Sequence, residues 1–86
     1  MAPATAEILG LQALSWLAGD EEALGRFLAA SGADGDALRQ AAADPAQLGV
    51  ILEFLLAHEE LLVRFCDDTS TKAQAVHAAR RQLEGA

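Results

Sequence analysis

Hydrophobic residues are densest between residues 48 and 66, where thirteen of the nineteen positions are apolar. If residues 44–57 form a helix, its surface is hydrophobic nearly all round, and only a thin stripe is left for water: Ala46, Gly49, Glu53 and Glu60. A helix with this pattern is stable only when other elements cover it. We therefore expect the rest of the chain to surround this segment.

Six short helices are expected from the spacing of apolar residues and from capping signals along the chain. The residues expected to cap the helix N-termini with their side chains are Thr5, Asp20, Asp34 or Asp36, Asp44 and Thr71. A glutamine follows three residues after the fourth and sixth starts, as in a capping box. Gly32 is the expected stop of the second helix, and the polar residues 58–60 mark a turn into the fifth.

Each expected helix has an apolar stripe that should face the core. On the first helix the stripe contains Ile8, Leu11, Leu14, Leu17 and Ala18, widened by Leu9, Ala13 and Trp16. The later stripes contain Leu24, Phe27 and Leu28, then Leu38 and Ala41, then Leu61, Leu62, Phe65 and Cys66, and finally Val76, Ala79 and Leu83. The pattern predicts an all-α fold, a compact bundle of five or six short helices in a single domain over residues 1–86.

The chain also resembles itself at a shift of 38 residues. Segments 13–41 and 51–79 share nine identities where about three would arise by chance: Leu14/Leu52, Leu17/Leu55, Glu21/Glu59, Glu22/Glu60, Leu24/Leu62, Arg26/Arg64, Phe27/Phe65, Ala37/Ala75 and Ala41/Ala79. Either the domain arose by duplication, or two helical patterns fell into phase. A duplication predicts two tandem three-helix units that pack through the first and fourth helices around an approximate twofold axis.

Length and composition narrow the class of protein. A chain of 86 residues with 52% hydrophobic content has enough apolar side chains to fold, despite a net charge of −7. Its core is small, so self-association through leftover apolar surface is expected. The single cysteine allows no internal disulfide. No signal peptide is recognised, and no apolar segment reaches the roughly 20 residues of a membrane-spanning helix. We therefore expect a cytoplasmic protein that does not bind membranes.

The distribution of charge bears on the choice of partner. An acidic chain is a poor ligand for nucleic-acid phosphates, so no nucleic-acid binding is expected. Residues 1–68 contain twelve acidic and three basic residues, whereas residues 69–86 contain one acidic and three basic residues. The basic end, with Arg80 and Arg81, either docks on the acidic body or is presented to a partner.

Few residues are candidates for chemistry. Cys66 precedes Asp67 and Asp68, whose negative charges disfavour the thiolate, so it is expected to be a poor nucleophile. The two aspartates oppose the dipole of a helix C-terminus. We expect them to be compensated either by a basic residue of the same chain (Lys72, Arg80 or Arg81) or by a basic patch on a partner.

Metal ligands are sparse as well. His58 and His77 are nineteen residues apart, and no HExxH or paired CxxC spacing occurs. A metal site at His58 and Glu59 stays open as an alternative. No cofactor is predicted, and the glutamate pairs at residues 21–22 and 59–60 are better explained by the favourable first turn of a helix than by catalysis.

The sequence resembles a known family through the runs Leu14–Asp20, Arg26–Leu28, Ser31–Gly32, Leu38–Arg39, Leu52–Glu59 and Phe65–Cys66. These segments are similar to small bacterial proteins, mostly alphaproteobacterial, grouped as domain of unknown function 3572. The resemblance spans nearly the whole chain and implies a small helical protein without an assigned activity. Residues 67–70 depart from the glycine-containing turn of that family.

Two classes of function follow from these observations. The first is a protein–protein interaction module without enzyme activity, which binds an unknown partner or itself through an apolar helical face. The candidate interaction residues are Trp16, Phe54, Asp67, Asp68, Arg80 and Arg81. The second is a small metal-dependent protein or enzyme that uses His58 and Glu59.

Overall fold

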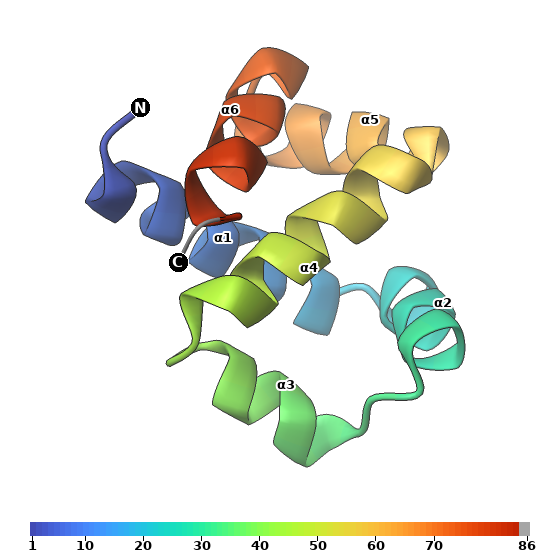
Figure 1. Cartoon of the computed structure of the whole chain (residues 1–86). Coiled ribbons are helices and arrows are strands. Elements are labelled where there is room, and N and C mark those ends of the chain that lie inside the picture. Colours follow the sequence, from blue (N-terminus) through green and yellow to red (C-terminus); the bar gives the residue numbers. More distant parts are fainter. Residues whose placement is uncertain (85–86) are drawn as a thin grey trace.

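The computed structural model describes residues 1–84, so residues 85–86 of the expected domain lie outside the described part. Within residues 1–84 the chain forms six helices and no strands, which confirms the all-α class. The helices are α1 (Pro3–Ala18), α2 (Glu21–Ser31), α3 (Gly35–Ala41), α4 (Pro45–Ala57), α5 (Glu59–Thr69) and α6 (Ala73–Leu83). In Figure 1, α4 runs diagonally across the front, with α5 and α6 above it and α2 and α3 below.

Three of the expected caps are confirmed. The side chains of Asp20, Asp34 and Asp44 accept hydrogen bonds from the backbone N–H groups of Ala23, Ala37 and Ala46, at 3.0, 2.9 and 3.1 Å. Each bond satisfies one of the N–H groups that a helix start leaves without an internal partner. The predicted stop of α2 is also confirmed.

Gly32 ends α2 in the left-handed conformation, with φ of 70°. A residue without a Cβ adopts this conformation at no steric cost.

Two predicted caps are wrong. Helix α1 begins at Pro3, two residues before Thr5, because a proline is well suited to the first turn, where its missing N–H is not needed. Helix α6 has Lys72 at the cap position without a side-chain hydrogen bond. The hydroxyl of Thr71 accepts a hydrogen bond from Thr69 Oγ1 instead, at 2.8 Å.

Helix α4 lies at the centre of the fold, against α1 and α6. Its residues Ile51, Leu52 and Leu55 are at most 1% exposed, so the expectation that other helices surround this segment is confirmed. The buried hydrophobic residues of the core are Ala6, Leu9, Ala13, Leu17, Ala23, Phe27, Ala41, Leu48, Ile51, Leu52, Phe54, Leu55, Leu61, Phe65, Val76, Ala79 and Leu83. The predicted inner positions of α6 are therefore correct.

The predicted inner face of α1 is partly wrong. Ile8 and Leu11 point outward, with 56% and 40% of their surface exposed. The buried face is instead Ala6, Leu9, Gly10, Ala13 and Leu17. Small residues on this face let α1 approach α4 so closely that a Cβ on Gly10 would lie 2.8 Å from Leu48 Cβ. Close packing of two helix backbones decided which face is inside, and a count of large apolar residues does not measure that closeness.

The second helix of each half has the same length and place in the 38-residue comparison. Helix α2 spans residues 21–31 and α5 spans residues 59–69. Their aromatic contacts correspond: Phe27 packs edge-to-face on Phe54 with ring centroids 5.1 Å apart, and Phe65 packs in the same manner on Trp16 at 5.7 Å. A shift of 38 residues converts one pair into the other.

The ion pairs and helix ends correspond as well. Arg26 bonds Glu60 at 2.6 Å, and Arg64 bonds Glu22 at 3.1 Å, so each arginine reaches the glutamate of the other half. At the end of each helix, a Ser31 or Thr69 hydroxyl donates to the carbonyl four residues earlier, at 2.7 Å in both cases. Reciprocal contacts of this kind are what a twofold arrangement of the two segments requires, although duplication as its origin stays a prediction.

The third helices do not correspond. Helix α6 has eleven residues and packs on both α1 and α4, whereas α3 has seven residues and packs mainly on α4. The twofold arrangement therefore covers the first two helices of each half and breaks down at the third. Places where the two halves differ are informative, because one half serves as an internal comparison for the other.

Candidate functional site

An apolar depression lies between α2 and α4, with a volume of about 260 Å³. We call it the α2–α4 groove, and its lining residues are Phe27, Ala30, Ser31, Val50, Glu53, Phe54, Ala57 and His58. Val50 is 44% exposed at its edge. Apart from Ser31, Glu53 and His58, the groove presents only hydrocarbon side chains, which favours an apolar occupant.

The floor of the groove is held rigidly. The Phe54 ring is 9% exposed and lies between Phe27 and His58, whose ring centroid is 4.3 Å from that of Phe54. His58 Nδ1 makes a hydrogen bond of 2.8 Å to the Phe54 carbonyl. His58 also joins the two helices, since its backbone N–H donates to the Leu55 carbonyl and it precedes the first residue of α5. These contacts fix the shape of the groove.

The place related to the groove by the 38-residue shift is closed. Trp16 occupies the position equivalent to Phe54, and its Nε1 donates a hydrogen bond to the Asp68 carboxylate at 2.8 Å. The Arg64 guanidinium lies 5.8 Å from the centroid of the indole ring, within the range of a cation–π contact. In the open half, the residue equivalent to Asp68 is Ala30, which has no polar group to reach across. The groove therefore exists on one side of the fold only.

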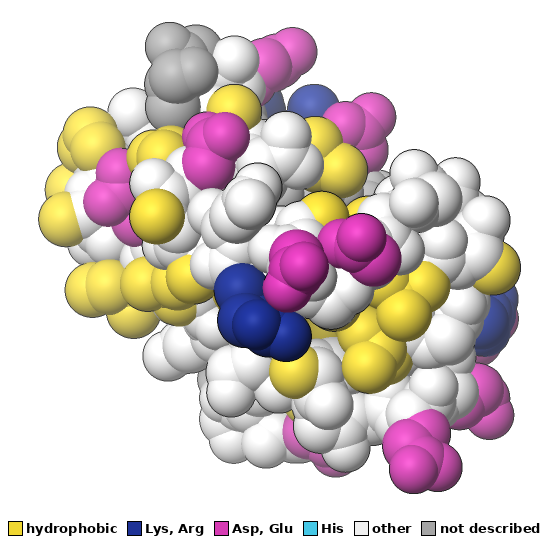
Figure 2. Space-filling view, turned by 90° about the horizontal axis from the view of Figure 1, so that it is seen from below, with side chains coloured by type: hydrophobic (Ala, Val, Ile, Leu, Met, Phe, Trp, Pro, Cys, Tyr) yellow, Lys and Arg dark blue, Asp and Glu magenta, His cyan; other side chains and the backbone are white. Residues whose placement is uncertain are grey.

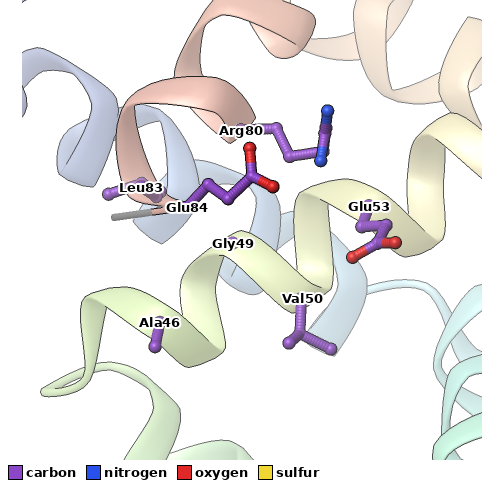
Figure 3. A pocket seen from close by; sticks show the side chains of 7 residues that line it. All are labelled: Ala46, Gly49, Val50, Glu53, Arg80, Leu83 and Glu84. Carbon is purple, nitrogen blue, oxygen red and sulfur yellow. The ribbon is translucent and has the colours of Figure 1, made fainter. Parts of the chain in front are cut away.

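A second depression of about 240 Å³ lies between α4 and α6 (Figure 3). It is lined by Ala46, Gly49, Val50, Glu53, Arg80, Leu83 and Glu84. Figure 3 shows Val50 and Glu53 projecting from α4, and Arg80 and Glu84 extending from α6. Because Val50 and Glu53 line both depressions, the exposed side of α4 forms one surface that continues from α6 to α2.

Charges outside the groove are partly neutralised between α2 and α5. Arg64 pairs with Asp20 and Glu22, and Arg26 pairs with Glu60. The backbone N–H of Ala23 lowers the pKa of Asp20, and Arg64 lowers it further. The hydrogen bond from Arg26 is the main cause of the lowered pKa of Glu60.

Elsewhere the surface is acidic. On the face seen in Figure 2, acidic side chains lie around groups of exposed hydrophobic side chains, and basic side chains are few. Such a surface attracts positively charged partners over distances of about a Debye length, roughly 8–10 Å at physiological salt.

The predicted interaction residues lie in different surroundings. Trp16 and Phe54 are both engaged within the fold, and only Phe54 lines a groove. The structure brings Trp16 and Asp68 together across 52 residues of sequence, so the indole N–H binds the carboxylate for which a basic partner was expected. Asp67 is exposed.

The basic end of the chain lies along α6. Arg80 lines the α4–α6 depression, and Arg81 is exposed in the last turn of the same helix, where a positive charge favours the helix dipole. Lys72, Arg80 and Arg81 form no ion pair with an acidic residue in the part of the chain that the structure describes. The expected compensation of Asp67 and Asp68 by these residues is therefore wrong.

The structure gives little support to chemistry at the remaining candidates. Burial raises the pKa of the Cys66 thiol and the charge of Asp67 raises it further, so the predicted weak nucleophile is confirmed. Among residues 1–84, no three His, Cys, Asp or Glu side chains come together as metal ligands. The Nδ1 atom of His58 is already bonded to a carbonyl of its own helix.

Three groove residues were missed at the level of sequence: Ala30, Val50 and Ala57. Small and branched apolar residues carry no chemical signal of their own. The repeat contains a usable hint, because Ala30 aligns with Asp68 and Val50 with Gln12, so the two halves differ most in polarity at this place.

A comparison with protein families gives one match, described as "Protein of unknown function (DUF3572)", over residues 3–86. The chain belongs to this family. The resemblance read from the sequence is thereby confirmed. No curated protein and no solved structure matches the DUF3572 chain. None of the helices within residues 1–84 is long and apolar enough to cross a membrane.

Proposed function

We propose that this DUF3572 protein is a cytoplasmic, non-enzymatic interaction module that binds an amphipathic helix of a partner protein through the α2–α4 groove. The observation that carries the proposal is the contrast between the two halves. The groove is open above Phe54, whereas the equivalent place is filled by Trp16 and its hydrogen bond to Asp68. A fold that closes one of two equivalent places has the means to close both.

The size of the groove favours a side chain over a metabolite. Small-molecule sites typically enclose roughly 300–1,000 Å³ and bury most of the ligand. The α2–α4 groove offers about 260 Å³ and is shallow, which fits one or two apolar side chains of a docked helix. Exposed Val50 and Ala57 extend the apolar contact along α4.

The charge around the groove defines the partner further. Glu53 lines both depressions on α4, and the chain has a net charge of −7. A helix with a large apolar residue flanked by Lys or Arg would complement both features, since opposite potentials accelerate association and exclude acidic partners. The alternative of a metal-dependent protein or enzyme using His58 and Glu59 has no comparable support.

Photo-crosslinking tests the proposal directly. A photoreactive amino acid is placed at Val50, and at Gln12 as the matched control from the equivalent position of the other half. In cells, the Val50 variant should cross-link a discrete protein through a segment with an apolar residue flanked by basic residues. A synthetic peptide of that segment should then bind the purified protein. Equal cross-linking from both positions would contradict the proposal.

A second test closes the groove by copying the other half. Phe54→Trp combined with Ala30→Asp transplants the Trp16–Asp68 pair into the groove, and affinity for the peptide should fall at least tenfold. Trp16→Phe with Asp68→Ala, made in the equivalent half, should leave the affinity unchanged. Circular dichroism of both variants checks that the helices are retained.

A further inference from the structure

The outer side of α1 has a regular apolar stripe that nothing covers within residues 1–84. Ala4, Ile8, Leu11, Ser15 and Ala18 follow one another at intervals of four, three, four and three residues, and all five are exposed. We call this set the α1 stripe. Alternating intervals of three and four place residues on the seam along which two helices pair in a coiled coil.

The α1 stripe carries no charge. The neighbouring exposed residues Thr5 and Gln12 are also uncharged, and Glu7 is the one charged residue between Pro3 and Ala18. The chain as a whole has thirteen acidic and six basic residues. Two copies that met through most other faces would bring like charges together, whereas the α1 stripe lets them meet without that repulsion.

The order of residues along the α1 stripe makes it complementary to itself. When two α1 helices lie antiparallel with Ile8 facing Leu11 of the second copy, Ala4 faces Ser15 and the small residues meet at both ends. Large side chains then fill the centre of the contact, and small ones allow the helix ends to approach. A twofold interface requires this kind of self-complementarity, and the antiparallel direction also pairs opposite ends of the helix dipoles.

We propose that the α1 stripe is a homodimer interface, in which α1 packs antiparallel on α1 of a second copy of this chain. The interface is separate from the α2–α4 groove, so a dimer would present two grooves to partners. Binding of a partner with two equivalent helices would then gain from the high effective concentration of the second site.

Sedimentation equilibrium over a range of protein concentrations tests the dimer. Ile8→Glu places a charge at the centre of the stripe, at a residue that is 56% exposed and so not needed for folding. The control is Val63→Glu on α5, a residue of similar shape that is 51% exposed. The wild-type protein should dimerise, Ile8→Glu should raise the dimer dissociation constant at least tenfold, and Val63→Glu should leave it unchanged. A wild-type protein that stays monomeric, or equal effects of the two variants, would overturn the inference.

Disulfide trapping tests the direction of the helices. In a Cys66→Ser background, Ala4→Cys and Ser15→Cys proteins are mixed and oxidised gently. The antiparallel register predicts a disulfide between Ala4→Cys and Ser15→Cys chains, formed at least tenfold faster than between Ala4→Cys and Val63→Cys chains. Faster formation of Ala4→Cys self-dimers would indicate a parallel pair, and equal rates for all mixtures would indicate random collision. Either result would contradict the proposed interface. Because no groove residue is altered, these outcomes do not depend on the function of the α2–α4 groove.

Discussion

Replacing Gly10 by alanine tests the closest approach of two helices in this fold. The new Cβ would lie 2.8 Å from Leu48 Cβ, whereas ordinary contact begins at 3.4 Å, so α1 and α4 have to separate by about 0.6 Å. Both carbons are attached directly to helix backbones, and neither can rotate away. The matched control is Gly25 on α2, where an added Cβ meets nothing within 4 Å.

The expected magnitudes have opposite signs. Alanine favours a helix by about 1 kcal/mol relative to glycine, and this is the whole effect expected at Gly25. At Gly10 the same gain is opposed by overpacking between rigid backbones, for which we take the upper end of the usual range, about 3 kcal/mol. Gly10→Ala should therefore lower the free energy of unfolding by about 2 kcal/mol, and Gly25→Ala should raise it by about 1 kcal/mol.

Urea unfolding followed by circular dichroism at the helical band measures both free energies, with the slope of the transition as a check on two-state behaviour. For a domain of this size, each kcal/mol corresponds to roughly 4–8 °C in Tm. If Gly10→Ala proves as stable as Gly25→Ala, the two helices are not in contact at this point, and the arrangement of α1 on α4 is incorrect.

Three further predictions concern individual contacts. Trp16→Phe and Asp68→Asn should each lower the free energy of unfolding by about 0.5–1.5 kcal/mol, and a double-mutant cycle should show that the two losses are not additive. Because the folded pKa of Asp20 lies below its unfolded value, its stabilisation is complete above about pH 4 and is lost as the pH falls through the folded pKa. Tm measured between about pH 5 and pH 2 should therefore fall less for Asp20→Asn, which keeps the cap, than for the wild-type protein. Gly32→Ala should lower the free energy of unfolding by about 1 kcal/mol, since alanine is strained at a φ of 70°.

The prediction of the helices succeeded where the signal is local. Asp20, Asp34 and Asp44 form hydrogen bonds with N–H groups two or three residues away, so each cap depends only on its own segment. Thr71 failed as a cap because a second hydroxyl, that of Thr69, engaged it. A sequence pattern contains both hydroxyls but not the geometry that pairs them.

The candidate site was predicted less well. Phe54 was recognised as an aromatic residue of interest, but the groove above it depends on Ala30 from another helix and on the absence of a partner for that position. Trp16 was proposed as an anchor on equal terms, and the structure instead bonds it to Asp68. Contacts between helices decide which of two similar aromatic residues faces solvent.

The sequence by itself determined that this chain is helical, where its helices begin and end within a few residues, and that the segment around Leu52 must be buried. These properties follow from backbone propensity, capping and the burial of apolar area, all of which are present in a short stretch of chain. Tertiary structure alone decided that Ile8 and Leu11 face outward and that one of two equivalent places remains open. The reason is that helix packing depends on how closely backbones approach, and small residues such as Gly10 control this distance without contributing to hydrophobicity.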